Sequence, residues 1–240
     1  MKTKNYFILL MMVLVGGLAF SACSNDDDDY VRMPTAYVNF VNAYAGADAL
    51  GIKLDNNSVD RGYSLKYGDY IPYDYGRAYP GTRRFSAGIP NTTTAIVDST
   101  INLRDSATYT SFVYGYQDTV SSILVEDKDA ANFDASKAYI RFFNLSENTP
   151  AVKVNLIQNN TPTAVFNDRP IDNQTSAATN AGFIATNEGS YTIQVTDMNG
   201  TQLAIRNEAA ALNAGRYYTI LTRGINGNAQ KPIVVGIFQH

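Results

Sequence analysis

The stretch Ala-Tyr-Val-Asn-Phe-Val-Asn at residues 36–42 recurs as Ala-Tyr-Ile-Arg-Phe-Phe-Asn at residues 138–144. Successive side chains of a β-strand point to opposite faces, so Val38 and Phe40 share one face of a strand, as do their counterparts in the second copy. Asn39 in the first copy and Arg141 in the second fall on the other face, which we expect to be the more exposed one. Each copy therefore predicts a β-strand that faces a core on one side.

Two further segments repeat in the same order. Residues 49–54 match residues 151–156, and residues 103–115 match residues 212–224. The repeated unit is about one hundred residues long, which is the size of a β-sandwich domain. The matches predict two tandem domains, residues 36–128 and residues 137–240, joined by a polar linker.

Composition and turn signals also favour β-structure. The chain holds 17 Tyr, 11 Phe and no Trp, and its Asn-Gly pairs at 199–200 and 226–227 are typical of hairpin turns. Prolines recur too often for long helices, and only residues 207–212 resemble a short one. We expect an all-β fold of two tandem immunoglobulin-like β-sandwich domains. A small barrel in each copy is the alternative.

Residues 1–22 have the three parts of a bacterial secretory signal peptide. Lys2 and Lys4 give a positive start, residues 6–18 are apolar, and small residues precede Cys23. The apolar run is shorter than the roughly 20 residues that a membrane-spanning helix needs. The segment ending at Cys23 resembles a lipobox, which implies a diacylglycerol thioether on Cys23 as the first residue of the mature chain. An ordinary signal peptide that happens to contain a cysteine is the alternative.

Residues 23–35 are expected to form an acidic tether. The run Asp26, Asp27, Asp28 and Asp29 is self-repelling and buries no apolar surface. Its place after the lipobox cysteine resembles the export signal of Bacteroidetes lipoproteins. The resemblance implies an outer-membrane protein that faces the extracellular side, with the membrane as a partner through the lipid anchor. A calcium site is the alternative, although the run lacks the ligand spacing and the turn glycine of a calcium loop.

Residue counts argue against several kinds of chemistry. The chain has one histidine, the terminal His240, and one cysteine. We expect no imidazole inside the fold, hence no Ser-His-Asp site, no catalytic residue, no zinc or other metal site and no cofactor. One cysteine also allows no intramolecular disulfide. The formal net charge of −3 gives no electrostatic support for nucleic-acid binding.

A dense group of tyrosines lies between residues 63 and 79. Tyrosine rings stack on sugar rings, so Tyr67, Tyr70, Tyr73 and Tyr75 are a candidate ligand platform. The alternative is that these rings pack along strands or cover a sheet edge. The second copy has no matching cluster.

Two other tyrosines are expected to be structural. Tyr109 stands six residues after Leu103, and Tyr218 stands six residues after Leu212. This spacing before a strand resembles the tyrosine corner of Greek-key sandwiches, where the phenol bonds to the backbone a few residues upstream. We predict that both rings are buried and hydrogen-bonded near residues 104–106 and 213–215.

The opening strand, the short apolar strand after it and the later Gly215-Arg216-Tyr217-Tyr218-Thr219 together resemble domain-of-unknown-function family 4397. The first copy departs from this pattern, because Ser106 or Ala107 stands where the second has the glycine. The resemblance covers residues 36–240 and implies an exported bacterial protein with tandem β-sandwich domains. It brings no catalytic residues.

Three functions follow from these observations. The first is a non-catalytic surface lipoprotein with a binding or structural role, whose partner is a glycan, a protein or another envelope component. The second is a pilus subunit or anchor that assembles by strand addition, for which residues 232–238 would suit. The third, weaker one is a glycoside-active enzyme using carboxylates such as Asp69 and Asp74.

Overall fold

The structure is a computed structural model that describes residues 32–59, 64–70 and 76–240. Every described strand lies in one compact unit, residues 34–240. The expected signal peptide, Cys23 and the acidic run 26–29 lie outside the described residues, so those expectations stay predictions. Among the described residues, a helix with the length and the apolar composition of a membrane span is not found.

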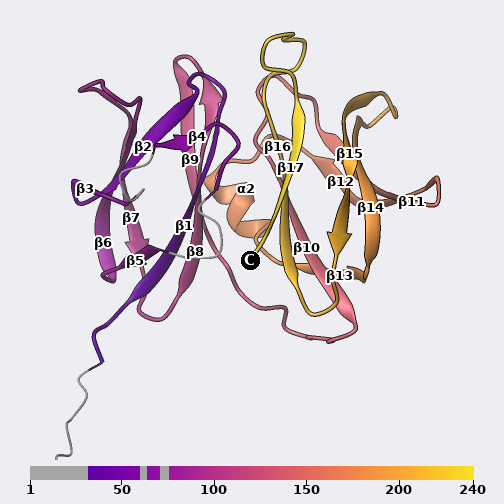
Figure 1. The fold of residues 1–240 in the computed structure, drawn as a ribbon, viewed down its shortest axis with the longest axis horizontal. Helices are drawn as coiled ribbons and strands as arrows, with labels where there is room; N and C mark the ends of the chain where they lie inside the picture. Colours follow the sequence, from indigo (N-terminus) through magenta and orange to yellow (C-terminus); the bar gives the residue numbers. More distant parts are fainter. Residues whose placement is uncertain (1–31, 60–63, 71–75) are drawn as a thin grey trace, which may run out of the picture. The chain divides into compact units, whose positions relative to one another are not determined.

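The first repeat is a β-sandwich of two sheets (Figure 1). Its strands are β1 (Ala36–Tyr44), β2 (Ala49–Leu54), β3 (Asn57–Ser58), β4 (Leu65–Lys66), β5 (Gly76–Ala78), β6 (Gly81–Gly88), β7 (Ala95–Leu103), β8 (Thr108–Tyr116) and β9 (Thr119–Glu126). One sheet has the order β5-β1-β8-β9 and the other β3-β2-β6-β7, with β4 paired to β2. The two strands that the repeat predicts, β1 and β2, therefore lie in different sheets.

The second repeat has the same plan. Its elements are β10 (Lys137–Asn144), β11 (Val152–Gln158), β12 (Thr161–Arg169), α2 (Gln174–Thr179), β13 (Ile184–Asn187), β14 (Gly189–Asp197), β15 (Gln202–Leu212), β16 (Tyr217–Arg223) and β17 (Val234–Gln239). The sheet orders are β13-β10-β16-β17 and β12-β11-β14-β15. The predicted all-β fold of two tandem immunoglobulin-like sandwiches is confirmed. The short helix expected at residues 207–212 is wrong, because these residues belong to β15 and pairing with β14 overrides the helix preference of their alanines.

The first strand of each repeat runs parallel to a late one. β1 pairs in parallel with β8, and β10 pairs in parallel with β16. Parallel neighbours cannot be joined by a tight hairpin, so the chain passes through the other sheet of the sandwich between them. The beginning and the end of each repeat thus lie in one sheet.

Each sandwich has its own apolar core. Phe40 stacks on Phe85 in the first core with ring centroids 5.9 Å apart, and Phe142 stacks on Phe166 in the second at 5.8 Å. The prediction that Val38 and Phe40 face a core is confirmed, since both are 1% exposed.

A third apolar cluster joins the two sandwiches. Within the unit 34–240 the four sheets form successive layers, and the inner ones, β5-β1-β8-β9 and β13-β10-β16-β17, face each other (Figure 1). Phe112 of β8 packs against Phe143 of β10 with ring centroids 5.3 Å apart. The expectation of a more exposed face at Asn39 and Arg141 is wrong: their exposed fractions are 4% and 0%. The other sandwich covers the face that the alternation pattern identifies as polar.

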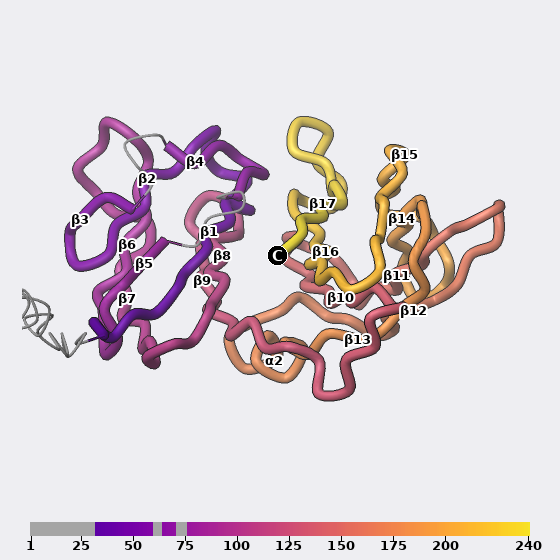
Figure 2. The backbone as a smooth tube through the Cα atoms, turned by 60° about the horizontal axis from the view of Figure 1, so that its bottom comes forward, coloured from indigo at the N-terminus to yellow at the C-terminus, as the bar shows by residue number. Residues whose placement is uncertain are grey.

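The edges next to this junction are also covered. Helix α2 of the second repeat contacts β9 of the first (Figure 2). The side-chain amide of Gln174 accepts a hydrogen bond from the Leu124 N–H at 2.9 Å and donates one to the Leu124 carbonyl at 2.9 Å. One side chain thus takes the place of a neighbouring strand at the β9 edge.

The C-terminal segment completes its own sheet. Residues 234–239 form β17, which pairs antiparallel with β16 along its whole length. Donation of this strand to a neighbouring subunit would require the strand to leave that pairing. This geometry does not favour the pilus alternative.

Candidate ligand-binding groove

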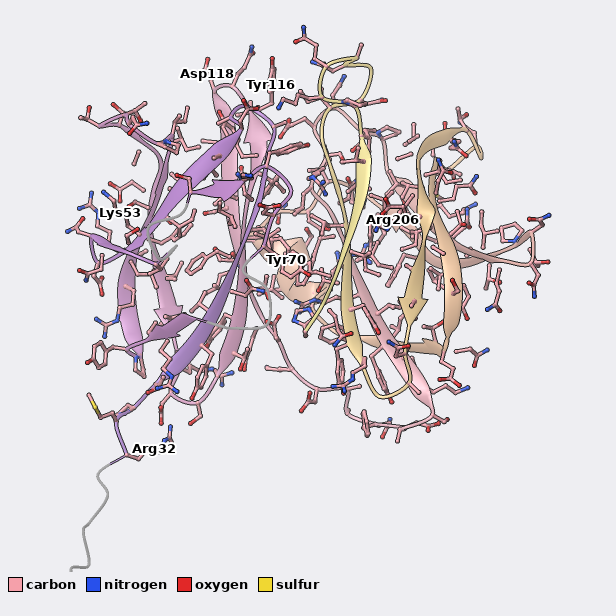
Figure 3. All side chains as sticks on the ribbon, in the orientation of Figure 1. Arg32, Lys53, Tyr70, Tyr116, Asp118 and Arg206 are labelled. Atoms are coloured by element: carbon pink, nitrogen blue, oxygen red, sulfur yellow. The ribbon has the colours of Figure 1, made fainter. Side chains whose placement is uncertain are left out.

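A polar groove of about 290 Å3 lies on the outer face of the β2-β6-β7 sheet in the first sandwich. Figure 3 labels Lys53 on this outer side, away from the second sandwich, and Tyr70 on the side that faces it. The lining comes from Gly51, Lys53, Arg84, Ser86 and Gly88 on the strands and from the loop of residues 89–94. The groove lies wholly within one sandwich.

Two glycines make the floor of the groove. Gly51 of β2 lies directly opposite Gly88 of β6, and each neighbours buried residues along its strand, so this pair belongs to the outer face. The sheet surface is low at this pair because neither residue has a side chain. A Cβ at Gly88 would lie 3.4 Å from the Thr94 carbonyl oxygen, so the end of the loop borders the floor at ordinary contact distance.

The loop after β6 forms one wall. Its turn is fixed by Thr92, whose N–H and hydroxyl donate to the Ile89 carbonyl at 3.2 and 2.7 Å. Asn91 has φ of +65°, a left-handed conformation that asparagine adopts more readily than most residues. Ile89, at the rim, is 36% exposed. The wall therefore offers hydroxyl and amide groups beside one apolar side chain.

The groove carries positive charge and no acidic lining residue. The guanidinium of Arg84 binds Asp98 with two hydrogen bonds, of 2.9 and 2.6 Å. These bonds hold the pKa of the Asp98 carboxyl below its usual value, and raise the pKa of Arg84. The ammonium of Lys53, opposite Ser86 on the adjacent strand, has no hydrogen-bond or ion-pair partner among the described residues. Among the described residues, this cation of the groove thus has no acidic partner.

The second sandwich shows what the same surface looks like when it is filled. In its matching pair of strands, Lys153 of β11 lies opposite Thr196 of β14 where the first copy has the two glycines. At the next position Asn155 lies opposite Gln194, and the Asn155 amide donates to the Gln194 amide oxygen at 3.2 Å. Because these side chains occupy the face, the glycine floor belongs to the first copy alone. The aligned repeats contain this difference, and sequence reasoning that looked only for similarity missed it.

A family model described as "Domain of unknown function (DUF4397)" matches residues 36–155, which is half of the chain. The chain belongs to the DUF4397 family. The match includes the whole first sandwich and the groove, and it extends into β11 of the second. No curated protein matches the chain.

Two solved structures resemble the chain distantly. One is the family 26 carbohydrate-binding module of Amy13K from Eubacterium rectale in complex with maltoheptaose, with 10% identity and a TM-score of 0.26, covering 86% of this chain and 97% of that one. The other, from Bacteroides eggerthii, is described as a cell adhesion protein, with 11% identity and a TM-score of 0.23, covering 87% of this chain and 95% of that one. TM-scores below 0.5 are too low to indicate a shared ligand.

Tyr67 and Tyr70, the described members of the candidate ligand platform, contact the second sandwich. Tyr70 stacks on Phe238 with ring centroids 4.8 Å apart. The Tyr67 ring lies 5.2 Å from the guanidinium carbon of Arg223 and 5.0 Å from the ammonium of Lys231. Burial raises the pKa of Tyr67, and Arg223 partly opposes this shift. Both rings therefore help to hold the two sandwiches together.

The remaining residues of the expected platform, Tyr73 and Tyr75, lie outside the described residues. A ligand role for the group stays a prediction. Asp69, one of the two carboxylates named for a glycosidase, is exposed, and Asp74 lies outside the described residues. Within the described ranges, no three His, Cys, Asp or Glu side chains form a group suited to a metal ion.

The predicted tyrosine-corner hydrogen bonds are present in both repeats. The Arg104 N–H donates to the phenol oxygen of Tyr109 at 3.1 Å, and the Asn213 N–H donates to that of Tyr218 at 2.9 Å. The two rings are 5% and 4% exposed. Each phenol thus fixes the connection between the sheets of its sandwich, which is a structural role.

The expectation that the lone histidine lies outside the fold is wrong. His240 is largely buried, and its Nε2 lies 2.7 Å from the hydroxyl of Thr219 while its Nδ1 lies 3.8 Å from a carboxylate oxygen of Asp127. Arg141 donates from Nε to Thr219 at 2.8 Å and from a terminal nitrogen to Asp127 at 2.5 Å. The pKa of His240 is lowered to about 4, mainly by burial; the negative charge of Asp127 opposes this shift, and the positive charge of Arg141 adds to it. The imidazole is therefore neutral at pH 7.

Thr219, His240 and Asp127 are the residue types of a nucleophilic site, but the Thr219 hydroxyl is not accessible to a substrate. Thr219 is 0% exposed, so no substrate reaches its hydroxyl in this structure. Asp127 follows the last strand of the first sandwich and also accepts a hydrogen bond from Thr110 of β8 at 2.7 Å. Arg141, Thr219 and His240 belong to the second sandwich. The cluster joins the two repeats, and burial rather than the position of the histidine in the sequence separates it from a catalytic arrangement.

Proposed function

We propose that this DUF4397 protein is a cell-surface lipoprotein, anchored in the outer membrane through Cys23, that binds a saccharide in the groove of its first sandwich without catalysing a reaction. The observation that carries the proposal is the difference between the repeats. The same sheet face is hollow and polar in one copy and filled in the other. Function resides in sites built on a fold. A difference at one exposed face between two repeats of the same fold therefore indicates a role for that face.

The chemistry of the groove supports binding rather than hydrolysis. Its lining supplies hydroxyl, amide and cationic groups, which hydrogen-bond to sugar hydroxyls. Glycoside hydrolysis needs two carboxyl groups on either side of the bond that breaks. No lining residue of this groove carries a carboxyl group.

A soluble form of residues 34–240 on a glycan array tests the binding proposal. The variant G51K/S86Q/G88T carries in the groove the residues that the second copy has at the matching positions. We expect the native form to bind a subset of glycans and the variant to lose that binding. Gln194→Ser, on the matching face of the second sandwich, is the control and should bind as the native form does. An absence of glycan binding by the native form, or equal binding by the filled variant, would refute the proposal.

The proposed lipid anchor and surface location are tested in cells. Cys23→Ala should abolish labelling by a fatty-acid probe, because the thioether cannot form. Replacing the four residues 26–29 with alanine should leave labelling intact and remove sensitivity to external protease. Unchanged protease sensitivity would show that the acidic run is not an export signal.

A further inference from the structure

The charge of the groove departs from that of the chain. The whole chain has 22 acidic and 19 basic residues and a formal net charge of −3. Two cations and no acid line the groove. Asp98 neutralises the Arg84 guanidinium through two hydrogen bonds, so Arg84 has little capacity left for an outside anion. Lys53 is the cation that remains.

A ligand that fills the groove must cover Lys53 at least in part. A neutral ligand would displace water from the ammonium without supplying an opposite charge, so the desolvation of Lys53 would be unfavourable. A ligand with one negative group near Lys53 replaces that water with an ion pair. Lys53, which has no acidic partner in the part of the chain that the structure describes, therefore favours a ligand with a single negative group at this end of the groove.

The other lining groups indicate the class of that ligand. The groove lies on the face of a sheet, whose main-chain groups are paired within β2, β6 and β7. A peptide binding there would find few backbone partners, whereas sugar hydroxyls bond to side chains such as Ser86 and the threonines of the loop. Ile89 at the rim offers an apolar contact for the C–H face of a sugar ring.

We infer that the groove takes a sugar bearing one carboxylate, such as a uronic or a sialic acid, with Lys53 as the residue that selects the charge. This inference rests on the proposed function and makes it more specific. Lys53 contributes to specificity, and the hydroxyl and amide groups contribute to binding of acidic and neutral forms alike.

An array of carboxylated glycans, each present as the free acid and as its methyl ester, tests the inference. Esterification removes the charge and leaves the ring hydroxyls in place. The native form of residues 34–240 should prefer the acid over the ester by about fivefold, the upper range for an exposed ion pair. This preference should shrink when salt is raised from about 0.05 to about 0.5 M, because the Debye length falls.

Three variants separate the charge of Lys53 from other effects. Lys53→Gln should bind acid and ester with equal affinity, because the charge that distinguishes them is gone. Lys53→Arg should keep the preference. Lys153→Gln removes the same charge from the matching sheet of the second sandwich and should change nothing. Thermal unfolding of each variant checks that it is folded.

Each remaining outcome overturns a different statement. Equal binding of acid and ester by the native form would refute the acidic ligand and leave the saccharide proposal intact. Equal loss of acid and ester binding in Lys53→Gln would show that the ammonium bonds to a hydroxyl, which also refutes it. Preference for a polyglutamate peptide over every glycan would refute the saccharide class. Glycan binding that survives in G51K/S86Q/G88T would refute the groove itself.

Discussion

Replacing Asp127 with alanine removes the carboxylate that faces the buried guanidinium of Arg141. The Arg141 side chain is 0% exposed and that of Asp127 is 7% exposed, so water cannot take the place of the lost partner without opening the junction. Arg141 would keep its hydrogen bond to Thr219 at 2.8 Å and its contact with the Phe183 ring, 4.5 Å from the guanidinium carbon. Neither compensates a full charge.

The expected cost follows from this burial. Removing one partner of a buried ion pair costs about 3 to 5 kcal/mol, because the other charge stays in a medium of low dielectric constant. Asp127 also accepts a hydrogen bond from Thr110 at 2.7 Å, so its loss leaves that hydroxyl without this acceptor. We expect Asp127→Ala to lower the free energy of unfolding by about 3 to 5 kcal/mol, a large share of the 5 to 15 kcal/mol typical of a folded protein.

Urea unfolding of residues 34–240, followed by circular dichroism and by tyrosine fluorescence, measures this change. Lys128→Ala is the control, because its side chain is 69% exposed and its ion pair with Glu126 should contribute less than about 1 kcal/mol. The double variant D127L/R141M replaces the pair with apolar side chains and should recover most of the stability. A loss below about 1 kcal/mol in Asp127→Ala, or no recovery in the double variant, would refute the argument from burial.

Three further predictions concern contacts within the same unit. Burial lowers the pKa of His240 to about 4, so between about pH 6.5 and 4 the unfolded chain binds a proton that the folded chain does not. The free energy of unfolding should therefore fall by up to about 3 kcal/mol as the pH falls over this range, and urea titrations of His240→Gln should show a flatter pH profile. Tyr218→Phe should cost about 1 kcal/mol in thermal unfolding, because the Asn213 N–H loses its acceptor, and an unchanged midpoint would contradict the corner. Gln174→Ala removes both bonds to the Leu124 backbone and should speed hydrogen exchange at the Leu124 amide, whereas unaltered exchange would mean that the edge is protected by other contacts.

The repeat made the fold predictable. Alternation at Val38 and Phe40 identified a strand and its core-facing side, and the spacing from Leu103 to Tyr109 predicted a hydrogen bond that the structure contains. These features are local: each depends on residues close together in the sequence and on the two-residue period of a strand. Because the same pattern occurs in both repeats, each repeat supports the strand and hydrogen-bond predictions made for the other.

The candidate groove was within reach of the sequence but was not found there. Gly51 and Gly88 are far apart in the chain, and only the register of β2 against β6 makes them neighbours. Alignment of the copies places them on Lys153 and Thr196, so a comparison of outward positions would have shown the missing side chains. That comparison needs the strand register, which the sequence does not state.

The two β-sandwiches, their cores and their tyrosine corners can be predicted from the sequence, because they arise from periodic patterns and short-range spacing within one repeat. What covers the polar face of the first strand depends on how the two repeats pack against each other. Alternation separates the two sides of a strand, but it cannot tell whether water or another sheet lies against the second side. Here another sheet does, so Asn39 and Arg141 are buried, and the terminal His240 is held between two sandwiches rather than left in solvent. The physical reason is that burial of a side chain depends on every segment that packs around it, including those most distant in the chain.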